Sequence, residues 1–143
     1  MEGVRRVSRS ILKYFVPLIV LVLILQVYFA GEGIFGARAS DATIEDSKEL
    51  DLHRGVGFIL TNPVALLLLI VALLAWLPDK RLRIISIVLP FLLFIQMLLA
   101  EGGRWVAALH PVNAFLLLGL LGYLASRLWR GERDAAPVSP SAV

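Results

Sequence analysis

The chain has 143 residues, of which 59% are hydrophobic and 17% are charged, and its mean hydropathy is +0.83. Soluble domains are roughly 45–50% apolar and about 25% charged, so this composition indicates a protein embedded in lipid. The net charge of +3 does not indicate a nucleic-acid partner, because the basic residues flank apolar runs instead of forming a stripe with aromatic residues. The absence of cysteine excludes disulfides, thiolate metal sites and cysteine nucleophiles.

Four apolar runs alternate with polar segments, and each run is close to the roughly 20 residues that cross a bilayer. They predict an all-α fold, an up-down-up-down transmembrane four-helix bundle within residues 14–128. The expected helices are at about 11–30, 54–77, 84–100 and 106–128. The segments around them are a basic N-terminus (1–13), an acidic outer loop (31–52) and a tail (129–143) whose Ala, Pro and Ser content predicts disorder.

The distribution of Lys and Arg predicts the orientation in the membrane. Ten of the 14 basic residues lie in the N-terminal segment, in the turn at residues 79–83 or at the C-terminal end. Because cytoplasmic loops carry the excess of Lys and Arg, we expect a multi-pass protein of the cell membrane with both termini in the cytoplasm. Trp76, Trp105 and Trp129 fall at the expected interfaces, where aromatic side chains anchor helices.

The first apolar run allows a second interpretation. A basic start, an apolar run and then Ala37–Arg38–Ala39 are also typical of a cleaved signal peptide. The run is longer than the usual apolar region of such a peptide, and about seven residues separate it from the cleavage motif. We therefore interpret residues 11–30 as a helix that is not cleaved.

Two stretches of the chain resemble each other. Leu25–Gly33 reads Leu-Gln-Val-Tyr-Phe-Ala-Gly-Glu-Gly, and Ile95–Gly103 reads Ile-Gln-Met-Leu-Leu-Ala-Glu-Gly-Gly. Each is followed by a loop and then by a helix that begins at a histidine, His53 or His110, and the chain has no other histidine. The repeat predicts two equivalent helical hairpins that place both histidines at the same outer level of the membrane.

Two histidines at one level suggest axial ligation of a haem iron, so His53 and His110 are the candidate metal ligands. A metal–imidazole bond of about 2 Å on each side requires helix axes about 14–16 Å apart. Adjacent helices pack only about 8–10 Å apart, so the two ligands have to stand on diagonal helices. The second and fourth helices are the diagonal pair of such a bundle. The sequence therefore predicts a b-type haem near the outer leaflet.

Residues near the histidines complete the predicted haem site. Gly57 and Ala114 lie one turn after each histidine and leave space for a flat macrocycle. Gln26 and Gln96 either orient the imidazoles or form hydrogen bonds between helices. The basic residues on the same outer side, which are candidate partners of the haem propionates, are Arg54, Arg104 and Arg38.

Each of these residues also has an explanation that needs no cofactor. A histidine at a helix start near the interface often only caps the helix or extends to the surface. Two histidines alone make a poor zinc site, because zinc takes three or four protein ligands. The acidic outer loop is a solvated surface, or it binds a partner protein.

The segments that carry the histidines resemble known membrane families. Within Leu25–Leu128, the motifs Leu-Gln-x-x-x-Ala-Gly, Leu-His-Arg-x-x-Gly, Ile-Gln-Met-Leu-Leu-Ala and Ala-Leu-His-Pro-Val-Asn-Ala resemble small bacterial four-helix membrane proteins of unassigned function. They are also similar to one half of heme A synthase, whose halves are four-helix bundles with histidines on the second and fourth helices. That resemblance implies His53 and His110 as axial haem ligands. Heme A synthase carries a Glu three residues before the first histidine, where this chain has Leu50, and this chain also lacks paired cysteines; the catalysis is therefore not implied.

Three functions are left open. The first is a b-type haem protein for electron transfer or sensing, which works with a redox partner. The second is a haem-free structural protein that serves as an accessory subunit of a larger membrane complex. The third, an enzyme similar to heme A synthase, has the least support because of Leu50 and the missing cysteines. We predict no catalytic residue.

Overall fold

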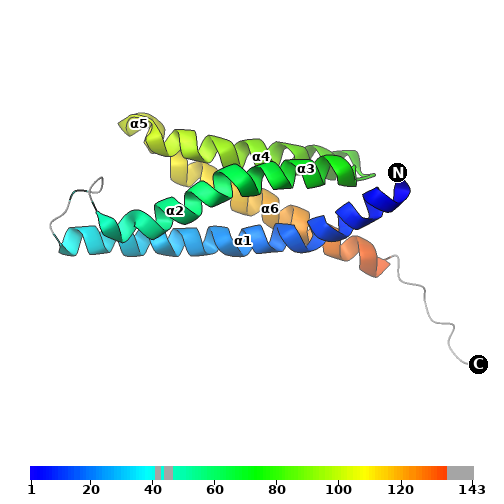
Figure 1. The fold of residues 1–143 in the computed structure, drawn as a ribbon, viewed down its shortest axis with the longest axis horizontal. Helices are drawn as coiled ribbons and strands as arrows, with labels where there is room; N and C mark the ends of the chain where they lie inside the picture. Colours follow the sequence, from blue (N-terminus) through cyan, green and yellow to red (C-terminus); the bar gives the residue numbers. More distant parts are fainter. Residues whose placement is uncertain (41–42, 44–46, 135–143) are drawn as a thin grey trace, which may run out of the picture.

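In the computed structural model, the described part of the chain comprises residues 1–40, 43 and 47–134 (Figure 1). Its elements, in chain order, are α1 (Glu2–Ala39), η1 (Lys48–Leu50), α2 (Asp51–Ile59), η2 (Leu60–Val64), α3 (Ala65–Ala75), α4 (Lys80–Glu101), α5 (Arg104–Ala107) and α6 (Leu109–Asp134). η1 is a 3-10 helix and η2 is a π-helix. No strand occurs among the described residues, so the predicted all-α fold is confirmed.

Within the described residues, four helical segments are long and apolar enough to cross a membrane. They are Glu2–Ala39, Lys48–Ala75, Lys80–Glu101 and Arg104–Gly131. Large apolar side chains on these segments point outward, as Leu66 (60% exposed) and Phe115 (70% exposed) illustrate. A bilayer solvates such a surface, so length and composition indicate a four-helix membrane protein.

The four spans pack in a closed ring, in which α1 contacts α3 and α6, and α4 contacts the same two helices. In such a ring α3 and α6 stand at opposite corners, and so do α1 and α4. The second and fourth spans are therefore the diagonal pair, as predicted, and the chain runs up and down through the bundle (Figure 1).

The bundle is closely packed toward the end that holds the N-terminus. Leu12, Leu68 and Leu121, from three different spans, are 0% exposed there. Toward the other end, the hairpin of α1 and α2 diverges from the hairpin of α4 and α6 (Figure 1). We call this second end the histidine end, because His53 in α2 and His110 in α6 lie there.

The first helix is longer than predicted, since α1 begins at Glu2 and ends at Ala39 instead of covering residues 11–30. The basic segment and residues 31–39 of the expected loop are therefore helical. A Cβ atom at Gly33 would lie 2.5 Å from Cδ2 of Leu50, and one at Gly36 would lie 2.7 Å from Cγ of Glu49. These glycines allow η1 to approach α1 closely instead of ending the helix, which explains the difference.

The other spans extend beyond most of their expected ends. The expected ranges 54–77, 84–100 and 106–128 become Lys48–Ala75, Lys80–Glu101 and Arg104–Gly131. α6 itself continues to Asp134, so residues 129–134 of the expected tail are helical. Hydropathy indicates only the part of a helix that lies in lipid, and a helix can continue into water beyond it. At the start of α4, for example, the side chain of Asp79 accepts a hydrogen bond from Arg81 N at 2.8 Å and caps the helix. Residues 41–42, 44–46 and 135–143, which include parts of the predicted loop and tail, lie outside the described residues.

Candidate functional site

His53 and Gln26 join α2 to α1 by a reciprocal pair of hydrogen bonds. Nδ1 of His53 lies 3.1 Å from the backbone oxygen of Gln26. In return, the side-chain Nε2 of Gln26 donates to the backbone oxygen of His53 at 3.1 Å. Each residue therefore positions the other across the first hairpin.

The second hairpin repeats this exchange with the same atoms. Nδ1 of His110 lies 3.0 Å from the backbone oxygen of Gln96, and Nε2 of Gln96 donates to the backbone oxygen of His110 at 2.9 Å. The duplication read from the sequence is thus present in the contacts as well. The glutamines both join helices and orient the imidazoles, although the imidazole is held by the backbone oxygen of each glutamine and not by its side chain.

These bonds determine which ring nitrogen carries the proton. A backbone carbonyl oxygen only accepts hydrogen bonds, so each Nδ1 is protonated and donates. A neutral ring of this tautomer keeps a lone pair at Nε2, on the side of the ring away from the bonded carbonyl. Histidines that ligate metals are held in the same way, by a hydrogen bond from the other ring nitrogen.

The two imidazoles lie close to each other between the hairpins, as an edge-type ring pair. Their ring centroids are 6.3 Å apart, and their planes are inclined by 70°. Both residues are half-buried. The structure therefore brings His53 and His110 together, as the repeat in the sequence predicts.

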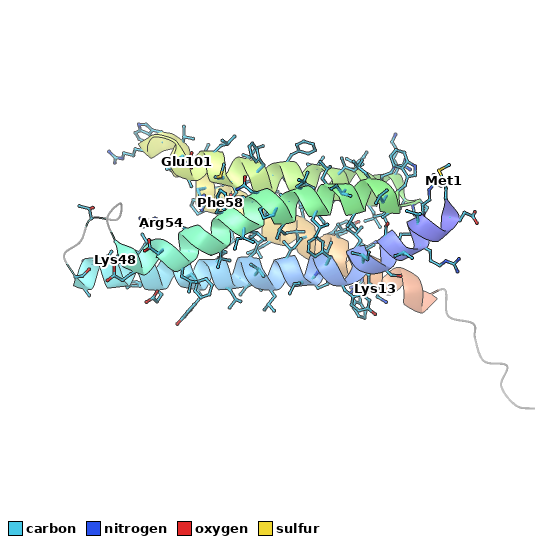
Figure 2. All side chains as sticks on the ribbon, viewed as in Figure 1. Met1, Lys13, Lys48, Arg54, Phe58 and Glu101 are labelled. Atoms are coloured by element: carbon cyan, nitrogen blue, oxygen red, sulfur yellow. The ribbon has the colours of Figure 1, made fainter. Side chains whose placement is uncertain are left out.

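A cavity of about 810 Å³ surrounds the two rings, and all four spans line it. Ligand sites commonly occupy about 300–1,000 Å³, so a cofactor-sized molecule fits. On the side that faces the packed core, the cavity is closed by Leu23, Leu60, Leu93 and Leu118. Figure 2 shows Arg54, Phe58 and Glu101, which also belong to the lining, at the histidine end of the molecule. The site is an apolar chamber with a few polar groups that converge on it.

Gly57 and Ala114 both line the cavity, as the predicted haem site requires. The structure adds a second reason for Gly57. A Cβ atom at this position would lie 2.9 Å from the side-chain Nε2 of Gln26. The missing side chain therefore makes room for the amide of Gln26 and for its bond to His53.

The three candidate arginines are placed differently. Arg54 lines the cavity and donates to the backbone oxygen of Ser47 at 2.9 Å and to Asp51 at 3.1 Å. Arg104 lies with its guanidinium 5.5 Å from the ring centre of Trp105. Arg38 is exposed in the last turn of α1. Of the three, the structure brings only Arg54 to the cavity lining.

The two hairpins differ in one contact that the repeat in the sequence does not predict. Asn113, three residues after His110, donates to the side-chain oxygen of Gln96 at 2.6 Å and to the backbone oxygen of Leu92 at 3.0 Å. The equivalent position in the first hairpin, three residues after His53, is Val56. The polar residue one turn beyond a histidine, on the same helix face, was the available signal.

A π-helix follows His53 in the second span but has no equivalent in the second hairpin. Pro63 lies inside it and has no N–H to donate, which removes a backbone bond. The hydroxyl of Thr61 donates to the backbone oxygen of Gly57 at 2.9 Å, and the amide of Asn62 donates to that of Phe58 at 2.9 Å. These side chains replace the lost backbone bonds, and π-helices of this kind occur frequently at functional sites.

The comparisons with known proteins give one finding. Residues 26–104 match a family described only as of unknown function, DUF6220. The matched range covers more than half of the chain; it contains Gln26, His53 and Gln96 and ends before His110. No curated protein and no solved structure matches the chain.

Proposed function

The chain belongs to DUF6220, a family of unknown function, and we propose that it is a membrane protein that binds one b-type haem between its two hairpins. Nε2 of His53 and Nε2 of His110 are the axial ligands. A haem supplies a single iron that changes between the ferric and ferrous states, which suits one-electron transfer or sensing. The similarity to one half of heme A synthase stays a prediction and enters this proposal only through the two ligands.

The separation of the two imidazole rings is the observation that carries the proposal. Two nitrogens bound to one iron at about 2 Å each, with about 1.1 Å from each nitrogen to its ring centre, place the centroids about 6.2 Å apart. The observed separation is 6.3 Å. Rings that share one axis through the metal rotate freely about that axis, so the 70° between their planes is compatible with this geometry.

The chemistry of the ligands also favours haem over a bare metal ion. No group of three or more His, Cys, Asp or Glu side chains that would hold a metal occurs in the described part of the chain. Zinc takes three or four protein ligands, whereas a porphyrin brings four nitrogens and requires only two axial ligands. The apolar walls of the cavity suit a macrocycle, and Arg54 at the lining is the candidate partner of a propionate.

We propose that the histidine end lies near the outer leaflet of the cell membrane, with both termini in the cytoplasm. The bias of Lys and Arg toward the termini and the turn at residues 79–83 supports this orientation. A haem near one leaflet exchanges electrons with a partner on that side of the membrane, so a redox partner or another membrane subunit is expected there.

The test is an absorption spectrum of the protein purified from haem-replete cells, with and without dithionite. The expected result is a reduced alpha band close to that of six-coordinate haem b, which disappears in His53→Ala and in His110→Ala. Purified protein without colour would sink the proposal and leave the haem-free accessory subunit as the better function.

Chemical rescue separates ligation from a structural role of the histidines. His53→Gly leaves a hole beside the iron, so added imidazole is expected to restore the six-coordinate spectrum. The matched control is Trp105→Ala, a change of an 81% exposed side chain at the same end of the bundle, which is expected to leave the spectrum unchanged. A six-coordinate spectrum that persists in His53→Gly without imidazole contradicts the assignment of this ligand.

A further inference from the structure

We infer that His53 is the exchangeable axial ligand, and that the iron face which it vacates binds a small neutral diatomic molecule of the carbon monoxide class. This inference rests on the proposed haem site and adds which histidine leaves the iron and which class of ligand replaces it. One coordinate bond replaces another, since the bond between iron and Nε2 of His53 breaks and a bond between iron and the carbon of CO forms. Both ligands donate an electron pair, so nothing is oxidised or reduced.

The His110 side of the cavity is held by a continuous chain of hydrogen bonds. His110 is bonded to Gln96, and the side-chain oxygen of Gln96 accepts from Asn113 at 2.6 Å. Gln96 and Asn113 are 7% and 8% exposed, so these bonds are shielded from competing water. Buried polar networks that are fully paired are rigid, so movement of His110 requires several bonds to break together.

The His53 side has the same first pair of bonds but no third member. Val56 stands where the second hairpin has Asn113 and offers no donor. Gln26 is only 8% exposed, and its side-chain oxygen is buried and has no hydrogen-bond partner among the described residues. A buried acceptor without a partner loses its hydration and gains no hydrogen bond in return, so the native arrangement around His53 is less stable than its counterpart.

The helix around His53 is also shorter and less regular than the helix around His110. His110 lies near the start of α6, a helix of 26 residues. His53 lies in α2, a helix of nine residues between a 3-10 turn and a π-helix. Short helical segments between irregular ones open locally at a lower free energy than long regular helices do. Detachment of His53 therefore requires less reorganisation than detachment of His110.

The cavity determines which ligand takes the vacated position. Its lining is mostly apolar, with Phe58, Leu60 and Met97 among the residues on the side of the second span and α4. An anion would lose its hydration in such a space, and Arg54 at the lining already donates to Ser47 and Asp51, whereas a neutral diatomic molecule loses almost no hydration. The site therefore favours CO-like ligands over cyanide or azide anions.

The test is CO binding by the dithionite-reduced holoprotein in two complementary variants. Val56→Asn supplies the partner that Gln26 lacks, and Asn113→Val removes the partner that Gln96 has. One hydrogen bond corresponds to a factor of about five in an equilibrium, so we expect about five-fold weaker CO binding in Val56→Asn and tighter binding in Asn113→Val. His53→Ala is expected to keep haem on His110 and to bind CO more tightly than the native protein, whereas His110→Ala retains less haem.

A second readout needs no haem. The melting temperature of the haem-free protein is expected to rise in Val56→Asn, because the new amide pairs with the buried oxygen of Gln26. An unchanged melting temperature counts against this pairing and against the inferred asymmetry. A six-coordinate haem that never binds CO, or that binds it more tightly in Val56→Asn, overturns the inference and leaves the haem proposal intact. Colourless protein overturns the haem proposal itself.

Discussion

The N-terminal end and the histidine end of the bundle are built on opposite plans. At the N-terminal end, side chains such as Leu12, Leu89 and Leu124 fill the space between the spans and are 0% exposed. At the histidine end, a cavity of about 810 Å³ takes the place of such a core. There the hairpins are joined internally by hydrogen bonds from Gln26 and Gln96 to backbone oxygens.

This difference separates the contacts that stabilise the fold from the residues that form the candidate haem site. In lipid, helices associate through close packing and hydrogen bonds, because lipid tails are as apolar as the side chains. The packed end supplies most of the packing between the four spans, and the open end adds the hydrogen bonds within each hairpin. Substitutions at the packed end should therefore change stability alone, whereas substitutions around the histidines should also change haem binding.

The largest effect on stability is expected from Leu121→Ala at the packed end. Leu121 is 0% exposed, and the change leaves a void whose lining loses dispersion contacts. We expect a loss of about 1–3 kcal/mol in the free energy of unfolding. This is less than the loss in a soluble core, because lipid surrounds the side chain with apolar groups even when the helices separate. Unfolding by SDS in mixed micelles measures it. Leu116→Ala, a change of a 49% exposed leucine on the same helix, is the control and should have little effect. Equal effects of the two changes would contradict the division between the ends.

A smaller loss is expected from Arg9→Met, also at the packed end. Arg9 donates from Nε to the backbone oxygen of Ala75 at 3.0 Å and from Nη2 to that of Trp76 at 3.2 Å. Trp76 ends α3 with a positive φ of 38°, so its neighbouring carbonyls depend on partners outside the helix. We expect a loss of about 1–2 kcal/mol with the haem content unchanged. Arg6→Met, which changes an exposed arginine of the same helix, should leave the unfolding transition where it is.

The sequence predicted the features that depend on chain order and apolar length. Four spans, the diagonal placement of the second and fourth, and the convergence of His53 and His110 all follow from the repeat and from the alternation of runs. The ends of the helices could not be read from hydropathy, because α1 continues through Gly33 and Gly36, where glycine would ordinarily indicate a break. The two glycines allow close packing against η1, and this contact exists only in the folded chain.

Side-chain partners inside the site were predictable only in part. Gln26 and Gln96 were identified from the repeat, but the pairing of each histidine with a backbone oxygen is not visible in residue types. Asn113 escaped notice because the repeat has no polar residue at Val56, and a comparison of the two copies favours what they share. The difference between the copies is the feature that distinguishes the two sides of the site.

The smallest change in the free energy of unfolding is expected from two glycines in α2. It tests how closely the side chains pack at the open end. A Cβ atom at Gly55 would meet nothing within 4 Å, whereas one at Gly57 would lie 2.9 Å from Nε2 of Gln26. Alanine stabilises a helix by roughly 0.5–1 kcal/mol relative to glycine, so Gly55→Ala should raise the free energy of unfolding by about that amount. In Gly57→Ala the same gain is offset, because the new methyl group displaces an amide that donates to His53 at 3.1 Å. If both variants gain equally in SDS unfolding, then Gln26 moves aside freely, and its bond to His53 does not hold α2 in place. If only Gly55→Ala raises the free energy of unfolding, then the side chain of Gln26 is held in place by its bond to His53. The open end is then packed as closely around this pair as the other end is packed around its leucines.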